Sequence, residues 1–156
     1  MKATVDQLKR RTGSDAISDA RSAAANFAPD ASAPVQDLLA GELLNISGGY
    51  REAQNLLSQI KSANPELSRM PEFQLAWGVS AYGIGKKDQA LRAFRSAADP
   101  QHASLASGYT AYALTAQGKP QMAESYKENF QSNPKVSHDP WIKMVMHAFF
   151  DIFLPE

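Results

Sequence analysis

Three six-residue segments decide the fold: GGYREA at residues 48–53, GKKDQA at 85–90 and GKPQMA at 118–123. In each segment a glycine precedes an alanine by five residues, and that alanine opens a new apolar run. The alanines Ala53, Ala90 and Ala123 are 37 and 33 residues apart. A period of this size, with two helical patterns and a turn in each unit, is typical of helical-repeat proteins.

Outward from the glycines, apolar residues at helical spacing predict six helices. The expected ranges are 35–46 and 51–63, 72–84 and 88–98, and 102–117 and 120–131, each pair forming an antiparallel hairpin. Pro65, Pro100 and Pro134 follow the second helix of each pair, where a proline ends the helix. Because one hairpin buries only part of its apolar surface, we expect the three to stack on one another.

Two segments flank the hairpins. Residues 1–34 are expected to contain a short polar helical stretch, a helix capped by Ser14 and a linker with two prolines. At the other end, Asp139 and Pro140 are typical of a helix start, and residues 141–154 are almost wholly apolar. We predict an all-α chain divided into 1–34, repeats at 35–65, 72–100 and 102–134, and a C-terminal helix at 139–156.

Length and composition suit one such domain and exclude several classes of protein. A chain of 156 residues can bury a core without disulfides, and no cysteine is present to form disulfides or thiolate metal sites. Sixteen basic and sixteen acidic residues give a formal net charge of zero, so no overall field favours nucleic acid or an anionic membrane. Residues 1–11 show no secretory signal and no apolar run is long enough to span a bilayer, so we expect a cytoplasmic protein.

The pattern resembles the tetratricopeptide repeat family, in which a small residue lies midway along the first helix, a glycine ends it, an alanine opens the second helix and a proline closes the unit. The resemblance covers residues 35–134, and Lys127 departs from it because an apolar residue is usual there. The matching residues are Gly41, Gly48, Tyr50, Ala53, Leu57 and Pro65; Trp77, Gly78, Tyr82, Gly85, Ala90, Phe94, Ala97 and Pro100; and Ala111, Leu114, Gly118, Ala123 and Pro134. The resemblance implies a right-handed α-α solenoid of about three repeats, with Leu57, Trp77 and Phe94 in its core.

The resemblance also implies a binding surface, the concave face lined by the first helix of each hairpin. The predicted groove residues are Leu38, Glu42, Asn45, Leu75, Val79, Tyr82, Tyr109 and Tyr112. An apolar groove with tyrosines suits an extended segment or an amphipathic helix of a partner protein. The alternative is that these side chains only pack within the chain. Leu38 and Glu42 stand where a clamp for a terminal carboxylate would need basic and amide groups, so tails of cytosolic heat-shock chaperones are not expected to bind.

Three interpretations of the apolar C-terminal helix compete. It caps the third hairpin, or it folds into the groove or pairs with a second copy, or it contacts a membrane surface or a partner. The residues expected at a self-association surface are Trp141, Met144, Val145, Phe149 and Phe153. Self-association through this helix would make the chain a homodimer or a larger scaffold.

No catalytic or metal-binding pattern is found in the sequence. The three histidines, His102, His138 and His147, are not paired at metal-ligand spacing. Residues 83–87 contain two glycines and two lysines, but they follow a predicted helix rather than a strand, which indicates a helix-ending turn and not a phosphate loop. No cofactor, metal ion or enzymatic activity is expected.

The sequence therefore predicts a non-enzymatic module that binds a peptide segment or a helix of a partner protein. Small chains with three such repeats also resemble bacterial type III secretion chaperones, and this resemblance implies an aggregation-prone secreted partner. A self-associating scaffold built through the C-terminal helix is the alternative, and an enzyme is the third hypothesis.

Overall fold

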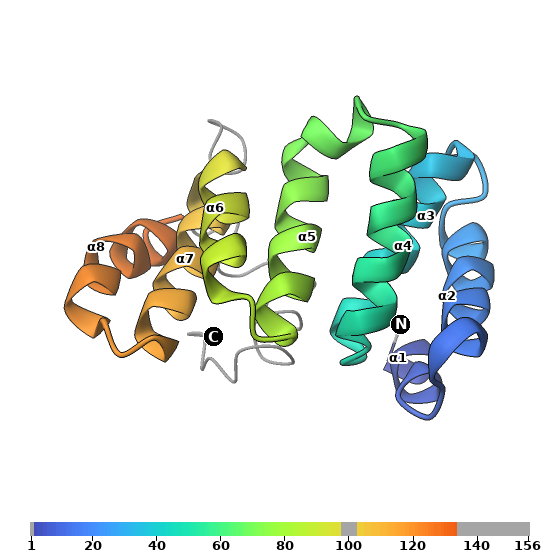
Figure 1. The fold of residues 1–156 in the computed structure, drawn as a ribbon, viewed down its shortest axis with the longest axis horizontal. Coiled ribbons are helices and arrows are strands. Elements are labelled where there is room, and N and C mark those ends of the chain that lie inside the picture. The colour runs from blue at the N-terminus through green and yellow to red at the C-terminus, as the bar shows by residue number, and fades with distance from the viewer. Residues whose placement is uncertain (1, 98–102, 134–156) are drawn as a thin grey trace.

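The computed structural model describes residues 2–97 and 103–133, and within these ranges the regular structure is entirely helical (Figure 1). The described elements are α1 (Lys2–Leu8), α2 (Gly13–Phe27), α3 (Ala33–Ile46), α4 (Tyr50–Ala63), the 3₁₀ helix η1 (Leu67–Arg69), α5 (Pro71–Gly83), α6 (Lys87–Ser96), α7 (Ala103–Ala116) and α8 (Pro120–Gln131). The predicted all-α class is confirmed. The predicted C-terminal helix at 139–156, with the self-association residues on it, lies outside the described residues.

The six helices predicted around the glycines agree closely with α3 to α8. The range of α8 is the predicted one, and the ends of the other five helices differ from the predicted ends by at most two residues. Helices pack mainly against their neighbours in sequence, as expected for the hairpins α3–α4, α5–α6 and α7–α8. The short helix η1 was not predicted, because its three residues give no periodic pattern.

One turn geometry ends the first helix of each hairpin. Gly48, Gly85 and Gly118 have φ angles of 85°, 88° and 78°, which a residue with a Cβ rarely adopts. The amide of the following residue then donates to a carbonyl five residues back, with N···O distances of 2.8, 2.8 and 2.9 Å in the three hairpins. This is the hydrogen-bond pattern of a Schellman motif, so the glycines found in the sequence mark three equivalent helix ends.

Two glycines let the helices of a hairpin approach closely. A Cβ placed on Gly41 of α3 would lie 3.0 Å from a methyl carbon of Leu57 on α4. A Cβ placed on Gly78 of α5 would overlap the ring of Phe94 on α6. Leu57 and Phe94 are themselves fully buried, so the absent glycine side chains provide the space these core residues fill.

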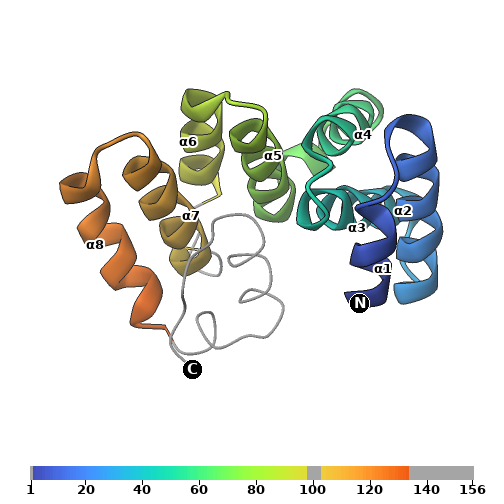
Figure 2. The same cartoon turned by 90° about the horizontal axis from the view of Figure 1, so that it is seen from below.

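The helices follow one another along the long axis of the molecule, from α2 at one end to α8 at the other (Figure 1). In the perpendicular view, α3, α5 and α7 lie toward one side of this row and α4 and α6 toward the other, with α8 beyond α7 at the end of the row (Figure 2). The contacts agree, because α5 packs against both α3 and α7. We call the side formed by α3, α5 and α7 the first-helix face, and the opposite side the second-helix face.

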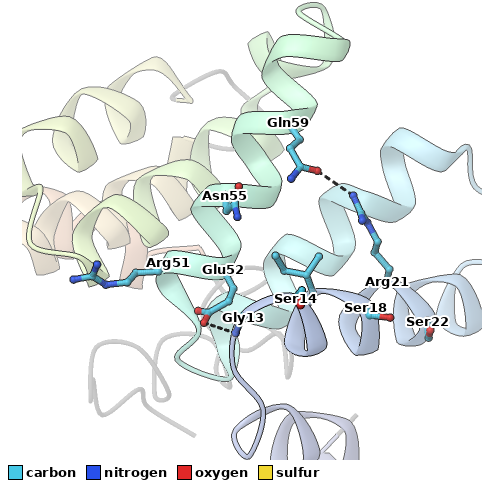
Figure 3. Close-up of a pocket in the computed structure, with 10 residues that line it drawn as sticks. Gly13, Ser14, Ser18, Arg21, Ser22, Arg51, Glu52, Asn55 and Gln59 are labelled. Atoms are coloured by element: carbon cyan, nitrogen blue, oxygen red, sulfur yellow. Dashed lines mark hydrogen bonds between the residues drawn. The ribbon is translucent and has the colours of Figure 1, made fainter.

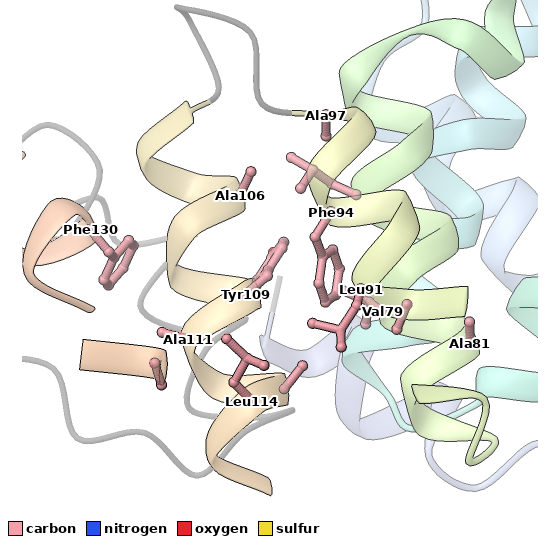
Figure 4. Close-up of a cluster of buried hydrophobic side chains, with 14 of the residues drawn as sticks. Val79, Ala81, Leu91, Phe94, Ala97, Ala106, Tyr109, Ala111, Leu114 and Phe130 are labelled. Carbon is pink, nitrogen blue, oxygen red and sulfur yellow. The ribbon is translucent and has the colours of Figure 1, made fainter. Parts of the chain in front are cut away.

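The buried apolar residues form a series of clusters along the row. One joins α2 to α3 and α4 and is rich in alanine, and a second joins α3 and α4 to η1 and α5. The third contains Val5 of α1 and Ile46 of α3 but lies mainly over α5 to α8, with Phe94 and Tyr109 at its centre (Figure 4). Their ring centroids are 5.2 Å apart, and this pair links the second hairpin to the third. Of the predicted core residues, Leu57 and Phe94 are fully buried and Trp77 is half-buried.

The sequence predicted that the helix before the hairpins, α2, starts at Ser14, and this prediction is wrong by one residue. Helix α2 begins at Gly13, Ser14 lies inside its first turn, and Thr12 at the cap position makes no side-chain hydrogen bond. The backbone amide of Gly13 instead donates to the carboxylate of Glu52 on α4, at 3.0 Å. A distant side chain therefore satisfies the helix start, which a local capping rule does not predict.

Candidate functional site

The candidate site is the polar part of the first-helix face, where α3, α5 and α7 come together. Each of these helices has a tyrosine or a glutamate that the sequence alone could not place relative to the others. Two groups of side chains lie on this face, a cluster of three tyrosines and an acidic pair with a fourth tyrosine.

Tyr50, Tyr82 and Tyr112 form the tyrosine cluster, and each is half-buried against the apolar core. The rings of Tyr82 on α5 and Tyr112 on α7 meet edge to face, with centroids 5.9 Å apart and an interplanar angle of 67°. Tyr50 at the start of α4 covers Gly83, where a Cβ would overlap its ring. Three tyrosines from three helices therefore make one continuous aromatic surface.

The pKa values of the tyrosine cluster reflect this shared environment. The pKa of Tyr50 is raised to about 12, mainly by burial and further by the neighbouring phenols of Tyr112 and Tyr82. Burial also raises the pKa of Tyr82, again with a contribution from Tyr112. The phenols of Tyr50 and Tyr82 therefore stay protonated near neutral pH.

The acidic pair consists of Glu42 on α3 and Glu72 on α5. The pKa of Glu42 is raised to about 7, mainly by burial and to a smaller extent by the negative charge of Glu72. Tyr109 on α7 belongs to the same surroundings, because burial and then the charge of Glu42 raise its pKa as well. A carboxylate half-buried beside another carboxylate is electrostatically unfavourable, and an incoming cation would relieve this.

The eight groove residues predicted from the sequence fall into two sets. Glu42, Tyr82 and Tyr112 are half-buried at the first-helix face. The other five are buried: Leu38, Asn45, Leu75, Val79 and Tyr109. Leu38 packs among the core residues that join α3 and α4 to α5, whereas Leu75 and Val79 belong to the cluster around Phe94. The structure thus leaves Glu42, Tyr82 and Tyr112 partly accessible, and it buries the aliphatic members of the predicted groove together with Asn45 and Tyr109.

Asn45 has a structural task between the first two hairpins. Its Nδ2 donates to the backbone carbonyl of Ala76 on α5 at 3.0 Å, and its Oδ1 is buried without a hydrogen-bond partner among the described residues.

Sequence reasoning missed Tyr50 and Glu72 as members of the site. Tyr50 opens a second helix rather than a first one, and its only sequence signal was the pair of glycines before it.

A separate polar pocket of about 550 Å³ lies between α2 and α4 (Figure 3). Its polar groups are largely used by the fold. Glu52 accepts from Gly13, and Arg21 on α2 donates to Gln59 on α4 at 3.2 Å and to Asp37 on α3 at 3.1 Å. These bonds fasten the N-terminal helix to the first hairpin, so the pocket is better explained by stability than by ligand binding.

Three searches for other features complete the description. Among the described residues, no group of three or more histidine, aspartate and glutamate side chains is arranged to hold a metal ion. None of the helices in the described ranges has the length and apolar content that a bilayer crossing requires. Comparison with protein-family models, with curated proteins and with solved structures finds no match for this chain.

Proposed function

We propose that the chain is a non-enzymatic protein-binding module of tetratricopeptide-like build, and that the first-helix face is the concave surface that receives the partner. The observation that supports this most is the convergence of Tyr50, Tyr82 and Tyr112 from three helices, with the pair Glu42 and Glu72 elsewhere on the same face. The equivalent glycine turns in the three hairpins also support a repeat architecture.

The chemistry of this face suits a basic amphipathic segment. Tyrosines provide apolar contact area with a hydroxyl at the tip, and few rotatable bonds are lost when they are immobilised. The face of an aromatic ring also attracts a lysine or arginine side chain. The acidic pair, toward the other end of α5 from Tyr82, offers a separate attraction for a cation, so a partner helix with lysine or arginine among apolar residues fits best.

The experiment is a selection of binding peptides with the full chain immobilised, followed by titration of the selected peptides in solution. The proposal predicts peptides that combine apolar residues with a lysine or arginine. The double variant Y82A/Y112A should bind them at least about tenfold more weakly, because aromatic side chains dominate interface energetics. The matched control Met122→Ala changes an exposed residue on α8 and should leave affinity unchanged.

Two outcomes would contradict this function. If Y82A/Y112A keeps its helical circular dichroism signal and its affinity, the first-helix face is not the binding surface. If the chain selects no peptide and light scattering finds it associated with further copies of itself, the self-associating scaffold explains it better. A chaperone for a secreted protein is the narrower form of the proposal, and capture of a secretion substrate through the same tyrosines would support it.

A further inference from the structure

A second surface, independent of the first-helix face, has the features of a binding site. Between α4 and α6, on the second-helix face, lie two adjoining pockets of about 320 and 530 Å³. Both are lined by Trp77 of α5 and Gln89 of α6, so they form one cleft along the two helices. The two walls each pack against α5, whose tryptophan provides the floor.

The floor of this α4–α6 cleft is aromatic. Trp77 is half-buried, and its ring stacks on Phe73 with centroids 6.0 Å apart and an interplanar angle of 16°. The ammonium of Lys61 lies 5.5 Å from the centroid of the Trp77 ring. An exposed part of a tryptophan fixed from below by a second ring is a rigid platform for an apolar side chain.

The rim of the cleft has charge of one sign. Arg51 and Lys86 stand at one end, Lys61 and Arg92 at the other, and no aspartate or glutamate is among the described residues that line the cleft. None of these four cations forms an ion pair within the described part of the chain. Arg51 also lines the pocket between α2 and α4, and its guanidinium lies on the side of α4 that faces away from α2 (Figure 3). In a chain of zero net charge, this is a concentrated positive site.

The spacing of the cations indicates the shape of the ligand. Arg51 and Lys61 are ten residues apart on α4, which corresponds to about 15 Å along the helix axis. Residues i and i+4 of an extended peptide are about 13 Å apart, and residues i, i+2 and i+4 point to the same side. A peptide with acidic residues at i and i+4 therefore reaches both cation pairs while the residue at i+2 faces Trp77.

We propose that the α4–α6 cleft binds an extended acidic segment of a partner protein, with an apolar residue midway between two glutamates or aspartates. The carboxylates meet Arg51 and Lys86 at one end and Lys61 and Arg92 at the other. The apolar residue lies on Trp77. The amide of Gln89, at the centre of the cleft, is placed to bond the peptide backbone.

The test measures binding of a fluorescein-labelled peptide to the full chain by fluorescence anisotropy at low salt. The peptide has the sequence glutamate, glutamine, leucine, glutamine, glutamate. Saturable binding with a Kd below about 1 mM is expected, and the affinity should fall as salt is added. A peptide with lysines in place of the glutamates should not bind the Y82A/Y112A variant, in which the first-helix face is weakened and the α4–α6 cleft is intact. The variant K61Q/R92Q should weaken binding about fourfold to twentyfold, since an exposed ion pair contributes about two- to fivefold each.

Three comparisons decide the result. The control K119Q/K127Q removes two exposed lysines near α8 and should leave binding unchanged. In a W141F background Trp77 is the remaining one of the two tryptophans, and its emission should shift on binding. Y82A/Y112A should have no effect, which separates this cleft from the first-helix face. The proposal is overturned if the wild-type chain does not bind the acidic peptide, if Y82A/Y112A binds the lysine peptide as tightly as the acidic one, or if K61Q/R92Q binds as tightly as wild type.

Discussion

Glu42 offers the sharpest test of the candidate site, because its environment links stability to pH. The pKa of its carboxyl rises from 4.5 to about 7, with burial as the main cause and the charge of Glu72 as the second. The folded chain therefore holds a proton on Glu42 at pH values where the unfolded chain has lost it. The contribution of this group to stability is complete below pH 4.5 and is lost as the pH rises through 7.

The perturbation is Glu42→Gln, which keeps the size of the side chain and removes its titration. A difference of this size between the folded and unfolded pKa corresponds to at most about 3 kcal/mol. Since the side chain is only half-buried, solvent screening reduces this, and we expect about 1 to 2 kcal/mol. The unfolding free energy of the variant, relative to that of wild type, should therefore increase by this amount as the pH rises from about 4.5 to about 8.

The assay is urea unfolding followed by circular dichroism, with wild type and variant compared at several pH values across this window. The quantity of interest is the change with pH in the difference between their unfolding free energies. Glu124→Gln, which alters an exposed glutamate on α8, should show no such change. Glu72→Gln should keep most of the pH dependence, because burial is the larger cause. A constant difference between Glu42→Gln and wild type would refute the environment described for Glu42.

Two further predictions concern packing within the hairpins, both measured by urea unfolding. Gly78→Ala should destabilise the chain by about 1 to 2 kcal/mol, because the added Cβ would overlap Phe94. Gly41→Ala should be nearly neutral, because the flexible end of Leu57 can yield and alanine favours helix. Equal losses of unfolding free energy in the two variants would contradict this. Phe94→Ala should lower the unfolding free energy by about 3 to 5 kcal/mol. The control Met122→Ala, at a residue that is 57% exposed, should lower it by less than about 0.5 kcal/mol. A small loss in Phe94→Ala would mean that the third cluster is not a stable core.

The sequence predicted the helices well because their signals are local. A glycine followed five residues later by an alanine, with a proline after the second helix, needs no knowledge of distant residues. The φ angles and hydrogen bonds at Gly48, Gly85 and Gly118 confirm the turns directly. The pairing of Gly41 with Leu57 and of Gly78 with Phe94 also follows from the repeat spacing, since both pairs are sixteen residues apart.

The site was predicted less well because its formation depends on contacts between hairpins. Helical spacing can show that Leu38 and Glu42 lie on one face of a helix, but not which of them the next hairpin covers. Leu38 is buried against α5, whereas Glu42 stays half-exposed beside Glu72. The start of α2 shows the same limit, because Glu52 satisfies Gly13 across 39 residues of sequence.

The net charge of zero conceals an ordered separation of charge. Glu42 and Glu72 stand on the first helices of their hairpins, whereas Arg51, Lys61, Lys86 and Arg92 line the walls made by the second helices and their turns. A hairpin repeat imposes this arrangement, because residues of its two helices that do not enter the core must face opposite sides of the row. If both proposals hold, one chain would receive a basic segment on one face and an acidic segment on the other. Two partners of opposite charge could then occupy it together, since neither surface uses a residue of the other.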